Sequence, residues 1–496
     1  MKKSITILLL ILITILGFSQ TDSIGWMEFR GPNAMGIAPA NANPPIHFNR
    51  DTNLLWETEI LPGWSSPCIV NDKIFLTGFN TTDSSLYTMA FNRSTGKLIW
   101  QDSVKPSVYL NIHPINSYAS KTVVSDGKRV YAAFSSYGII SYDLNGKRLW
   151  KYEHDPEIDF YGGSSSPIIN NDEVICVIGS ETDPRILALD CITGDSIWTI
   201  RARDQDWGNF NLRSTPVIWK DQMVMHFNWN LVAYNLNTRE LSWWMPIPNS
   251  GSATPVIYRD TLFVNSWLQG GEANTRPELL SFSELLNRYD LNGNKSIERE
   301  ELPDDKYYFE RPESPDAPMS KRKLNDEYFF NIFDGNSDKA YSEDEWLAIW
   351  KAMDPYMQDH GMYAISMEGS GERAQKEMFW KVNQNTPEVP SPLITGSDVF
   401  FIKSGGIVTT INRSTGEITF NERINSGGAF LSSPLLSADR IYTASYNGNV
   451  AVLSADDYSV IAINKLKEKI GSSPVVIGDV LYIRTNEHLF AFRNEE

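Results

Sequence analysis

Two short segments of the sequence place oxygen-bearing residues at the spacing that a calcium ion requires. In the twelve residues from Asp290 to Glu301, side-chain oxygens stand at the first, third, fifth and twelfth positions, and the seventh offers its backbone carbonyl. A hard cation such as Ca²⁺ takes about six to eight oxygen ligands, and this spacing wraps them around one point. The residues from Asp334 to Glu345 repeat the pattern. The predicted calcium ligands are Asp290, Asn292, Asn294, Ser296, Glu301, Asp334, Asn336, Asp338, Ala340 and Glu345.

Helices are expected on both sides of these loops, because apolar residues such as Phe282 and Leu285 recur there at helical spacing. The segment therefore resembles a paired EF-hand module. The sixth loop position, where such loops usually carry glycine, is Lys295 in one loop and Lys339 in the other, so a weakened calcium affinity is expected. A Pro-rich linker leaves open whether the two loops pack face to face. Residues 278–359 carry 20 acidic and 10 basic side chains, and a solvated acidic helix–turn–helix is the alternative interpretation.

The remainder of the chain repeats a different unit. Each copy opens with Ser-Pro or Thr-Pro, continues with apolar runs between polar turns, and predicts one four-stranded β-meander. The openings are Ser66-Pro67, Ser166-Pro167, Thr215-Pro216, Thr254-Pro255, Ser391-Pro392, Ser433-Pro434, Ser473-Pro474 and a degenerate copy at Ser120-Lys121-Thr122. Apart from one gap of 137 residues, they lie about 39 to 54 residues apart. This period is typical of β-propeller blades, which must stack because one meander cannot bury both its faces.

Large residues at the end of each copy give an independent count of eight. These positions are Trp56, Trp100, Trp150, Trp198, Trp243, Trp380, Phe420 and, as the weakest match, Ala462. Trp56 precedes the first opening, whereas only three strands follow the last opening. We therefore predict an all-β fold, an eight-bladed propeller that an N-terminal strand near 53–58 closes. The propeller is expected over residues 26–267 and 362–494, with the small α-helical, EF-hand-like insertion of 278–359 between the second and third strands of blade 5.

The closing motif of each copy resembles a known repeat. Residues 140–150, 187–198 and 232–243 share an apolar run, an Asp or Asn, a polar turn and a closing Trp, as in the tryptophan-docking repeat of PQQ-like, quinoprotein-type β-propellers. The lead-in of residues 26–32 resembles that of bacterial secreted members. This resemblance implies the fold but no single activity. The repeat occurs in quinoprotein dehydrogenases and in non-enzymatic scaffolds, including the propeller subunit of the outer-membrane barrel assembly machinery.

The N-terminus predicts the compartment. A basic start at Met1-Lys2-Lys3, an apolar run over 5–16 and small residues at Gly17 and Ser19 are typical of a cleavable signal peptide of residues 1–19. The apolar run is too short for a membrane anchor. We therefore expect a periplasmic or extracellular protein.

The net charge limits the kinds of partner that the protein can bind, and the cysteine content limits the disulfide bonds that it can form. A net charge of −17 argues against nucleic acid and anionic membranes as partners. The three cysteines are Cys68, Cys176 and Cys191. Buried free thiols are the favoured interpretation, and a Cys176–Cys191 bridge is the alternative in an oxidising compartment.

One face of the predicted ring carries residues suited to binding. Strands alternate in direction, so the insertion shares a face with the loops that precede the innermost strands. Aromatic residues and one arginine lie in or beside these loops, namely Trp64, Tyr118, Tyr161, Trp207 and Arg213. Such residues at the mouth of an axial funnel are suited to a protein or glycan ligand. Simple packing between loops is the alternative.

The resemblance also raises an enzymatic hypothesis, a PQQ-dependent quinoprotein dehydrogenase for alcohol or sugar oxidation with a diverged site. Such enzymes typically hold the quinone between a Trp and a vicinal disulfide, and this sequence has no adjacent cysteine pair. None of its six histidines pair at metal-binding spacing. No catalytic or cofactor-binding residue is predicted, and PQQ is not expected. The preferred hypothesis is a calcium-binding, PQQ-repeat propeller that acts as a non-enzymatic binding or scaffold protein.

Overall fold

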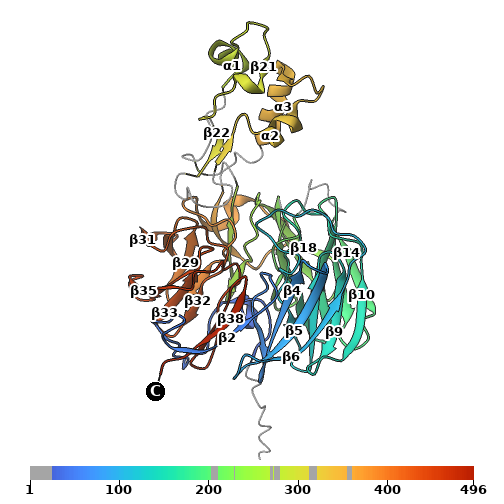
Figure 1. Ribbon diagram of the computed structural model, residues 1–496, viewed down its shortest axis with the longest axis vertical. Coiled ribbons are helices and arrows are strands. Elements are labelled where there is room, and N and C mark those ends of the chain that lie inside the picture. Colours follow the sequence, from blue (N-terminus) through green and yellow to red (C-terminus); the bar gives the residue numbers. More distant parts are fainter. Residues whose placement is uncertain are drawn as a thin grey trace, which may run out of the picture.

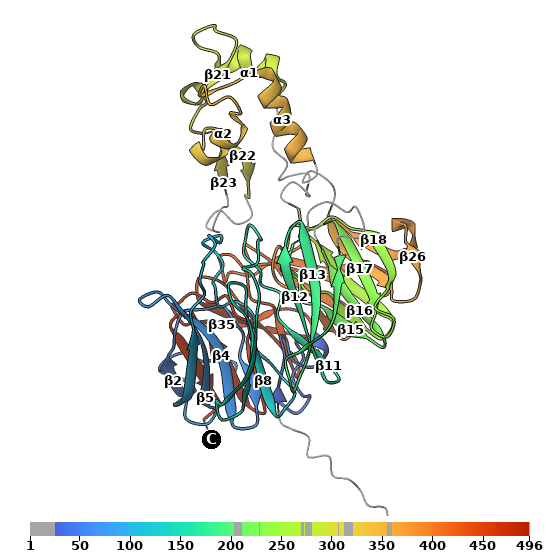
Figure 2. The ribbon, with the colours of Figure 1, turned by 90° about the vertical axis from the view of Figure 1, so that its right-hand side faces the viewer.

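The chain forms a ring of β-sheets with a small helical unit standing on one face (Figures 1 and 2). The computed structural model describes residues 25–202, 211–227, 229–268, 272, 280–305, 307–311, 321–354 and 360–495. Eight antiparallel blades of four strands each confirm the predicted all-β, eight-bladed propeller. The predicted signal peptide lies outside the described residues. Within the described part of the chain, no helix is long and apolar enough to cross a membrane.

The first four blades follow the chain in order. Blade 1 contains β3 (Cys68–Val70), β4 (Lys73–Asn80), β5 (Ser85–Asn92) and β6 (Leu98–Val104), and β1 (Gly25–Trp26) adds an edge beside β3. Blade 2 contains β7 (Val124–Ser125), β8 (Arg129–Phe134), β9 (Gly138–Asp143) and β10 (Arg148–Glu153). Blade 3 contains β11 (Ile168–Asn170), β12 (Glu173–Ser180), β13 (Asp183–Asp190) and β14 (Ser196–Arg201). Blade 4 contains β15 (Val217–Trp219), β16 (Gln222–His226), β17 (Asn230–Asn235) and β18 (Leu241–Pro246), with β26 (Gly371–Glu372) parallel to β18.

The other four blades complete the circle. Blade 5 contains β19 (Val256–Tyr258), β20 (Thr261–Ser266), β25 (Gly361–Ser366) and β27 (Met378–Val382). Blade 6 contains β28 (Leu393–Thr395), β29 (Asp398–Lys403), β30 (Ile407–Asn412) and β31 (Ile418–Arg423). Blade 7 contains β32 (Leu435–Ser437), β33 (Arg440–Ala444), β34 (Asn449–Ser454) and β35 (Val460–Lys465). Blade 8 contains β36 (Val475–Ile477), β37 (Val480–Arg484), β38 (His488–Phe492) and β2 (Leu54–Glu59). Two single turns, η1 (Pro32–Ala34) and η6 (Gln375–Glu377), lie outside the sheets.

The ring closes by pairing the two ends of the propeller. Strand β2 runs antiparallel to β38, with Trp56 opposite Ala491 and Glu57 opposite Phe490. This pairing confirms the predicted closing strand. Because β2 and β38 share one sheet, opening the ring requires breaking that sheet as well as its buried apolar contacts.

The openings of the repeats form a circle of hydrogen bonds around the axis. In each blade the backbone N–H of the opening residue donates to the hydroxyl of the next blade's opening residue, at 2.9 to 3.3 Å. The order is Ser66, Thr122, Ser166, Thr215, Thr254, Ser391, Ser433, Ser473 and back to Ser66. Thr122 therefore supplies the hydroxyl in the degenerate opening. The circle satisfies eight buried N–H groups that have no partner inside their own blades.

Each closing tryptophan packs against the turn of the following blade. The indole nitrogens of four of them donate to a turn carbonyl at 2.9 to 3.1 Å, pairing Trp56 with Arg93, Trp100 with Leu144, Trp150 with Cys191 and Trp380 with Arg413. These turns contain glycines with positive φ, at Gly96, Gly146, Gly194 and Gly416. An added Cβ there would lie 2.4 to 2.7 Å from the ring or its Cβ, so the close approach requires glycine.

At two other junctions an arginine covers the tryptophan ring instead. The guanidinium of Arg239 lies 4.7 Å from the ring centroid of Trp198, and that of Arg373 lies 5.0 Å from the ring centroid of Trp243. A cation over an indole face is attracted by the ring's quadrupole. Six of the eight blade junctions thus use tryptophan contacts of two kinds, whereas blade 6 packs Phe420 against Tyr458 of blade 7, with 5.5 Å between ring centroids.

The insertion leaves the ring between β20 and β25 and folds around its own apolar core. Its elements are α1 (Phe282–Tyr289), β21 (Ile297–Glu298), η4 (Arg299–Glu301), β22 (Tyr307–Glu310), β23 (Lys321–Lys323), α2 (Glu327–Phe333), β24 (Ala340–Tyr341) and α3 (Glu343–Met353). Leu285, Ile297 and Trp346 are buried in this core. Figures 1 and 2 show it projecting from one face of the ring.

The three cysteines are buried and free, so the Cys176–Cys191 alternative is wrong and the free-thiol interpretation is confirmed. Burial raises the pKa of the Cys176 thiol to about 12. A thiol with so high a pKa is not a nucleophile at neutral pH.

The tryptophan–glycine contact predicts a difference between two glycines of blade 6. Gly416→Ala places a Cβ 2.7 Å from Trp380, whereas Gly396→Ala places one in open space, and both positions have positive φ. We expect Gly396→Ala to cost about 1 kcal/mol of unfolding free energy through backbone strain. Gly416→Ala should cost about 2 kcal/mol more, because either the ring or the turn must move. Denaturant unfolding measures both, and equal losses would contradict the docking role of Gly416.

Candidate functional site

The two predicted cation loops have the same hydrogen bonds at equivalent positions. In the first loop, Asp290 accepts the backbone N–H groups of Asn294 (3.2 Å) and Lys295 (3.0 Å). Glu301 closes the same loop by accepting the N–H of Leu291 at 2.9 Å. These bonds fold the chain back so that the first and last acidic residues lie on one side of the loop.

The second loop repeats this arrangement. Asp334 accepts the N–H groups of Asp338 (3.1 Å) and Lys339 (2.9 Å), and Glu345 accepts the N–H of Gly335 (2.8 Å). Partial burial raises the pKa of Glu345, but the hydrogen bonds from Ser342, Gly335 and Asn336 outweigh it and leave that pKa below its usual value. Glu345 is therefore ionised at neutral pH, as a cation ligand must be.

The loops lie side by side. Ile297 and Tyr341, at the eighth positions, pair across a two-residue antiparallel bridge between β21 and β24. The question that the Pro-rich linker left open is thus answered, because the loops do face one another. Of the two predicted carbonyl ligands, Ser296 immediately precedes this bridge and Ala340 lies within it.

The two lysines at the sixth positions have the backbone conformation of glycine. Lys295 has φ +66° and Lys339 has φ +68°, in the left-handed region. A residue with a Cβ costs about 1–2 kcal/mol there. Each loop therefore has a tight turn at its sixth position, where a lysine holds a strained backbone conformation. This strain is consistent with the expected weakening of calcium affinity.

Capping residues join the loops to their helices. Ser281 begins α1 by accepting the N–H of Glu284, and Ser342 begins α3 by accepting the N–H of Glu345. Glu345 also reaches back to the Ser342 N–H at 2.9 Å, so one carboxylate caps the helix and completes the loop. The position of α3 and the shape of the second loop are therefore coupled.

A cavity of about 170 Å³ lies at the axis. All eight opening hydroxyls line it, together with Trp64, Tyr161 and Arg213 from the set predicted at the funnel mouth. Tyr118 instead packs against Phe79, with 4.9 Å between ring centroids. Trp207 lies outside the described residues. Three of the five residues predicted at the funnel mouth therefore line the cavity.

The sequence analysis did not find Glu388, which lines the same cavity. Arg311, in the insertion, places its Nη1 atom 2.7 Å from Glu388 Oε2. The Arg311 guanidinium also lies 5.5 Å from the ring centroid of Trp267. This ion pair joins the insertion to the rim of the axial cavity. No periodicity or motif marks either residue, since they meet only in the folded chain.

A second buried cluster holds the base of the insertion. Glu272 Oε2 accepts a hydrogen bond from Lys403 Nζ at 2.8 Å, and its Oε1 lies 3.4 Å from His360 Nε2. The three side chains are 8%, 3% and 2% exposed. Glu272 precedes the insertion and His360 follows it, whereas Lys403 ends β29 in blade 6. The residues at the two ends of the insertion are therefore both held against blade 6.

We expect the Glu272 cluster to give acid-dependent stability. Burial alone would raise the Glu272 pKa, but His360 and Lys403 lower it to about 2. The resulting stabilisation is complete above the unfolded pKa of about 4.3 and is lost as pH falls toward 2. Glu272→Gln should therefore cost about 3 kcal/mol at pH 7, and the difference from wild type should shrink below pH 4. Thermal unfolding across pH tests this, with the exposed Glu368→Gln as control; a difference independent of pH would contradict it.

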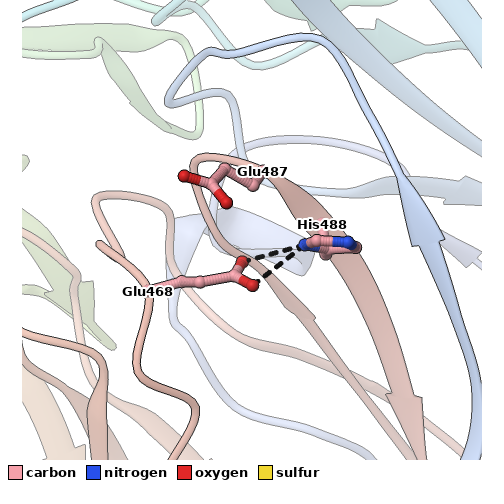
Figure 3. A group of neighbouring side chains, drawn as sticks. All are labelled: Glu468, Glu487 and His488. Atoms are coloured by element: carbon pink, nitrogen blue, oxygen red, sulfur yellow. Dashed lines mark hydrogen bonds and ion pairs between the residues drawn. The ribbon is translucent and has the colours of Figure 1, made fainter.

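Another group of possible metal ligands lies on blade 8, at Glu468, Glu487 and His488 (Figure 3). His488 Nδ1 is 2.9 Å from Glu468 Oε1, and a Glu487 carboxylate oxygen lies within 4.8 Å of ligand atoms of both residues, although no hydrogen bond or ion pair joins it to them (Figure 3). Arg50 also pairs with Glu468 and lies 2.8 Å from Glu57 on β2. Arg50 already supplies a cation to Glu468, and its two ion pairs tie the closing strand to the last blade. We interpret it as structural.

Eight meanders, six of them docked through a tryptophan, and an N-terminal closing strand define a PQQ-type β-propeller. The family described as outer membrane protein assembly factor BamB matches residues 46–275 and 357–496, and the chain belongs to this family. The unmatched residues 276–356 contain the helical insertion.

Similarity to individual proteins is more distant. The chain is 24% identical over 252 residues to the outer membrane protein assembly factor BamB of Burkholderia pseudomallei (strain K96243), a match that covers 50% of this chain and 58% of that protein. The crystal structure of BamB from Moraxella catarrhalis superposes with a TM-score of 0.51 at 12% identity, covering 89% of this chain and 98% of the other. A europium-containing methanol dehydrogenase gives a TM-score of 0.51 at 12% identity, covering 95% and 98%. At these identities the structural likeness shows the fold alone.

Proposed function

We propose that this protein is a secreted or periplasmic, non-enzymatic propeller scaffold that binds a protein partner through the face carrying the insertion. In this proposal the insertion is a paired EF-hand module, and Ca²⁺ fixes its shape. The observation that carries the proposal is the identical hydrogen bonding of two loops that face each other across β21 and β24.

The donor set of both loops suits Ca²⁺. Each loop offers two carboxylates at its first and twelfth positions and amide or carboxylate oxygens between them, which are the hard ligands that Ca²⁺ prefers. Glu301 and Glu345 would hold the ion with both carboxylate oxygens. Because Glu345 also caps α3, occupancy of the second loop would restrict the orientation of that helix.

The position of the insertion supports a role in recognition. It rises from the face that bears the axial cavity, and the Arg311–Glu388 and Glu272–Lys403 ion pairs hold its base. Structured loops on a rigid ring are the usual place for binding sites. The family's description as an assembly factor favours a protein partner, and the net charge of −17 favours one with a basic surface.

Calcium binding is tested by isothermal titration calorimetry. We expect wild type to bind two ions, Glu301→Gln to bind one, and the double variant Glu301→Gln with Glu345→Gln to bind none, because the last ligand supplies both carboxylate oxygens. The neighbouring Glu300→Gln, which keeps every predicted ligand, should bind two. Two ions bound by the double variant would show that these loops are not the site.

The scaffold role is tested by cross-linking and capture from the native cell envelope. Wild type with Ca²⁺ should capture a specific protein, and the double Gln variant should capture it at least about tenfold less well, since its loops would lose their order. Deletion of residues 278–359 should abolish capture while circular dichroism still shows a folded ring.

Two outcomes would contradict the scaffold role. Unchanged capture by the deletion variant would remove the insertion from partner binding. A bound-quinone absorbance after addition of PQQ and Ca²⁺, together with dye-linked oxidation of an alcohol or sugar, would instead favour the dehydrogenase hypothesis.

A further inference from the structure

The eight opening hydroxyls have an unusual hydrogen-bond balance. Each oxygen accepts one backbone N–H, and each side chain lines the axial cavity. The residues are at most 7% exposed. Among the described residues, no acceptor takes the proton of any of these hydroxyls. Eight O–H groups therefore line the axis without an acceptor in the described part of the chain, and each can donate a hydrogen bond into the cavity.

Donors that face a cavity favour a ligand with many oxygen atoms. A ligand that accepts from several hydroxyls gains about 0.5–1.5 kcal/mol from each, the net value of a hydrogen bond that replaces one to water. Each hydroxyl also accepts an N–H, which polarises it and strengthens its own donation. Since a hydroxyl keeps a second lone pair, the same groups can accept hydrogen bonds from the ligand.

The charges around the cavity favour a neutral ligand. Arg213 lies 3.3 Å from Asp159, and Glu388 lies 2.7 Å from Arg311, so each charged residue of the lining has a partner of opposite sign. The chain as a whole carries a net charge of −17, which repels anions at long range. A free carboxylate or phosphate would therefore find neither an uncompensated cation nor a favourable field.

The wall also offers apolar surface. The rings of Trp64 and Tyr161 line the cavity. The Trp64 indole N–H is used in a hydrogen bond to the Ile115 carbonyl (3.1 Å), and Arg213 lies 4.8 Å from the Tyr161 ring centroid. The Trp64 ring thus provides apolar surface to the C–H groups of a ligand whose O–H groups meet the hydroxyl circle, whereas Arg213 covers one face of Tyr161.

We propose that the axial cavity binds a small neutral polyol, such as a monosaccharide. Such a molecule has hydroxyls that both donate and accept, C–H faces that pack on aromatic rings, and no charge. The cavity of about 170 Å³ is smaller than the roughly 300–1,000 Å³ of pockets for drug-sized ligands, which favours a single sugar ring over a longer glycan. This site is separate from the calcium loops and from the protein-binding role proposed above.

Ligand titrations followed by tryptophan fluorescence and calorimetry test the proposal. The probes are glucose, galactose, mannose, N-acetylglucosamine and mannitol, with sodium acetate and sodium phosphate as anionic probes. Ser252→Tyr fills the cavity without removing a hydroxyl of the circle, and Ser196→Tyr, on the exposed start of β14, is the matched control. Thr215→Val keeps the side-chain shape and removes one hydroxyl.

We expect saturable binding of at least one neutral polyol by wild type and Ser196→Tyr, and a loss of at least about 50-fold in Ser252→Tyr. Thr215→Val should bind about fivefold more weakly, the effect of one hydrogen bond. If Thr215→Val is too unstable to purify, the comparison of Ser252→Tyr with wild type still tests whether the cavity binds the polyol. Binding of the anions in place of the polyols, binding unaffected by Ser252→Tyr, or no binding of any probe would each overturn the proposal.

Discussion

The closed circle of N–H to hydroxyl hydrogen bonds at the axis is the constraint on which the rest of the ring depends. Every blade donates to the next, and the last donates to the first through Ser473 and Ser66. No blade can leave its place without exposing a buried N–H on one side and a buried hydroxyl on the other. The geometry is satisfied only when the circle closes, so the number of blades is fixed together with the pairing of β2 and β38.

The outer contacts secure the same junctions by a more tolerant means. A tryptophan against a glycine turn and a tryptophan beneath an arginine fill the same space, so the sequence can vary at the rim. At the axis the tolerated change is smaller, since Thr122 replaces the serine of a Ser-Pro opening only by keeping a hydroxyl. This contrast follows from directionality, because a hydrogen bond to a buried donor needs an oxygen in one place, whereas dispersion and cation–π contacts need only bulk.

The insertion is attached to a rigid ring. It has its own apolar core, so it does not disturb the packing of blade 5, and β20 and β25 pair as adjacent strands despite the interruption. Two ion pairs, which are buried or partly buried, fix the base of the insertion. They join it to Glu388 and Lys403, which both follow blade 5 in the chain. A folded unit held at its base on a ring presents its loops at a defined height above the axial cavity.

The sequence alone determined the repeat, the eight blades, the closing strand and the spacing of the predicted cation ligands. Each of these features depends on residues that are close together in the sequence. They are an opening hydroxyl, a turn with its aromatic residue, and acidic residues at fixed offsets within twelve positions. Only the tertiary structure decided that the two loops face each other through Ile297 and Tyr341 and that Arg311 meets Glu388. It also gathered eight hydroxyls from across the chain around one cavity and placed Glu272 beside Lys403, 131 positions away. Such contacts have no period and no motif, because they arise from where the closed ring brings distant segments together.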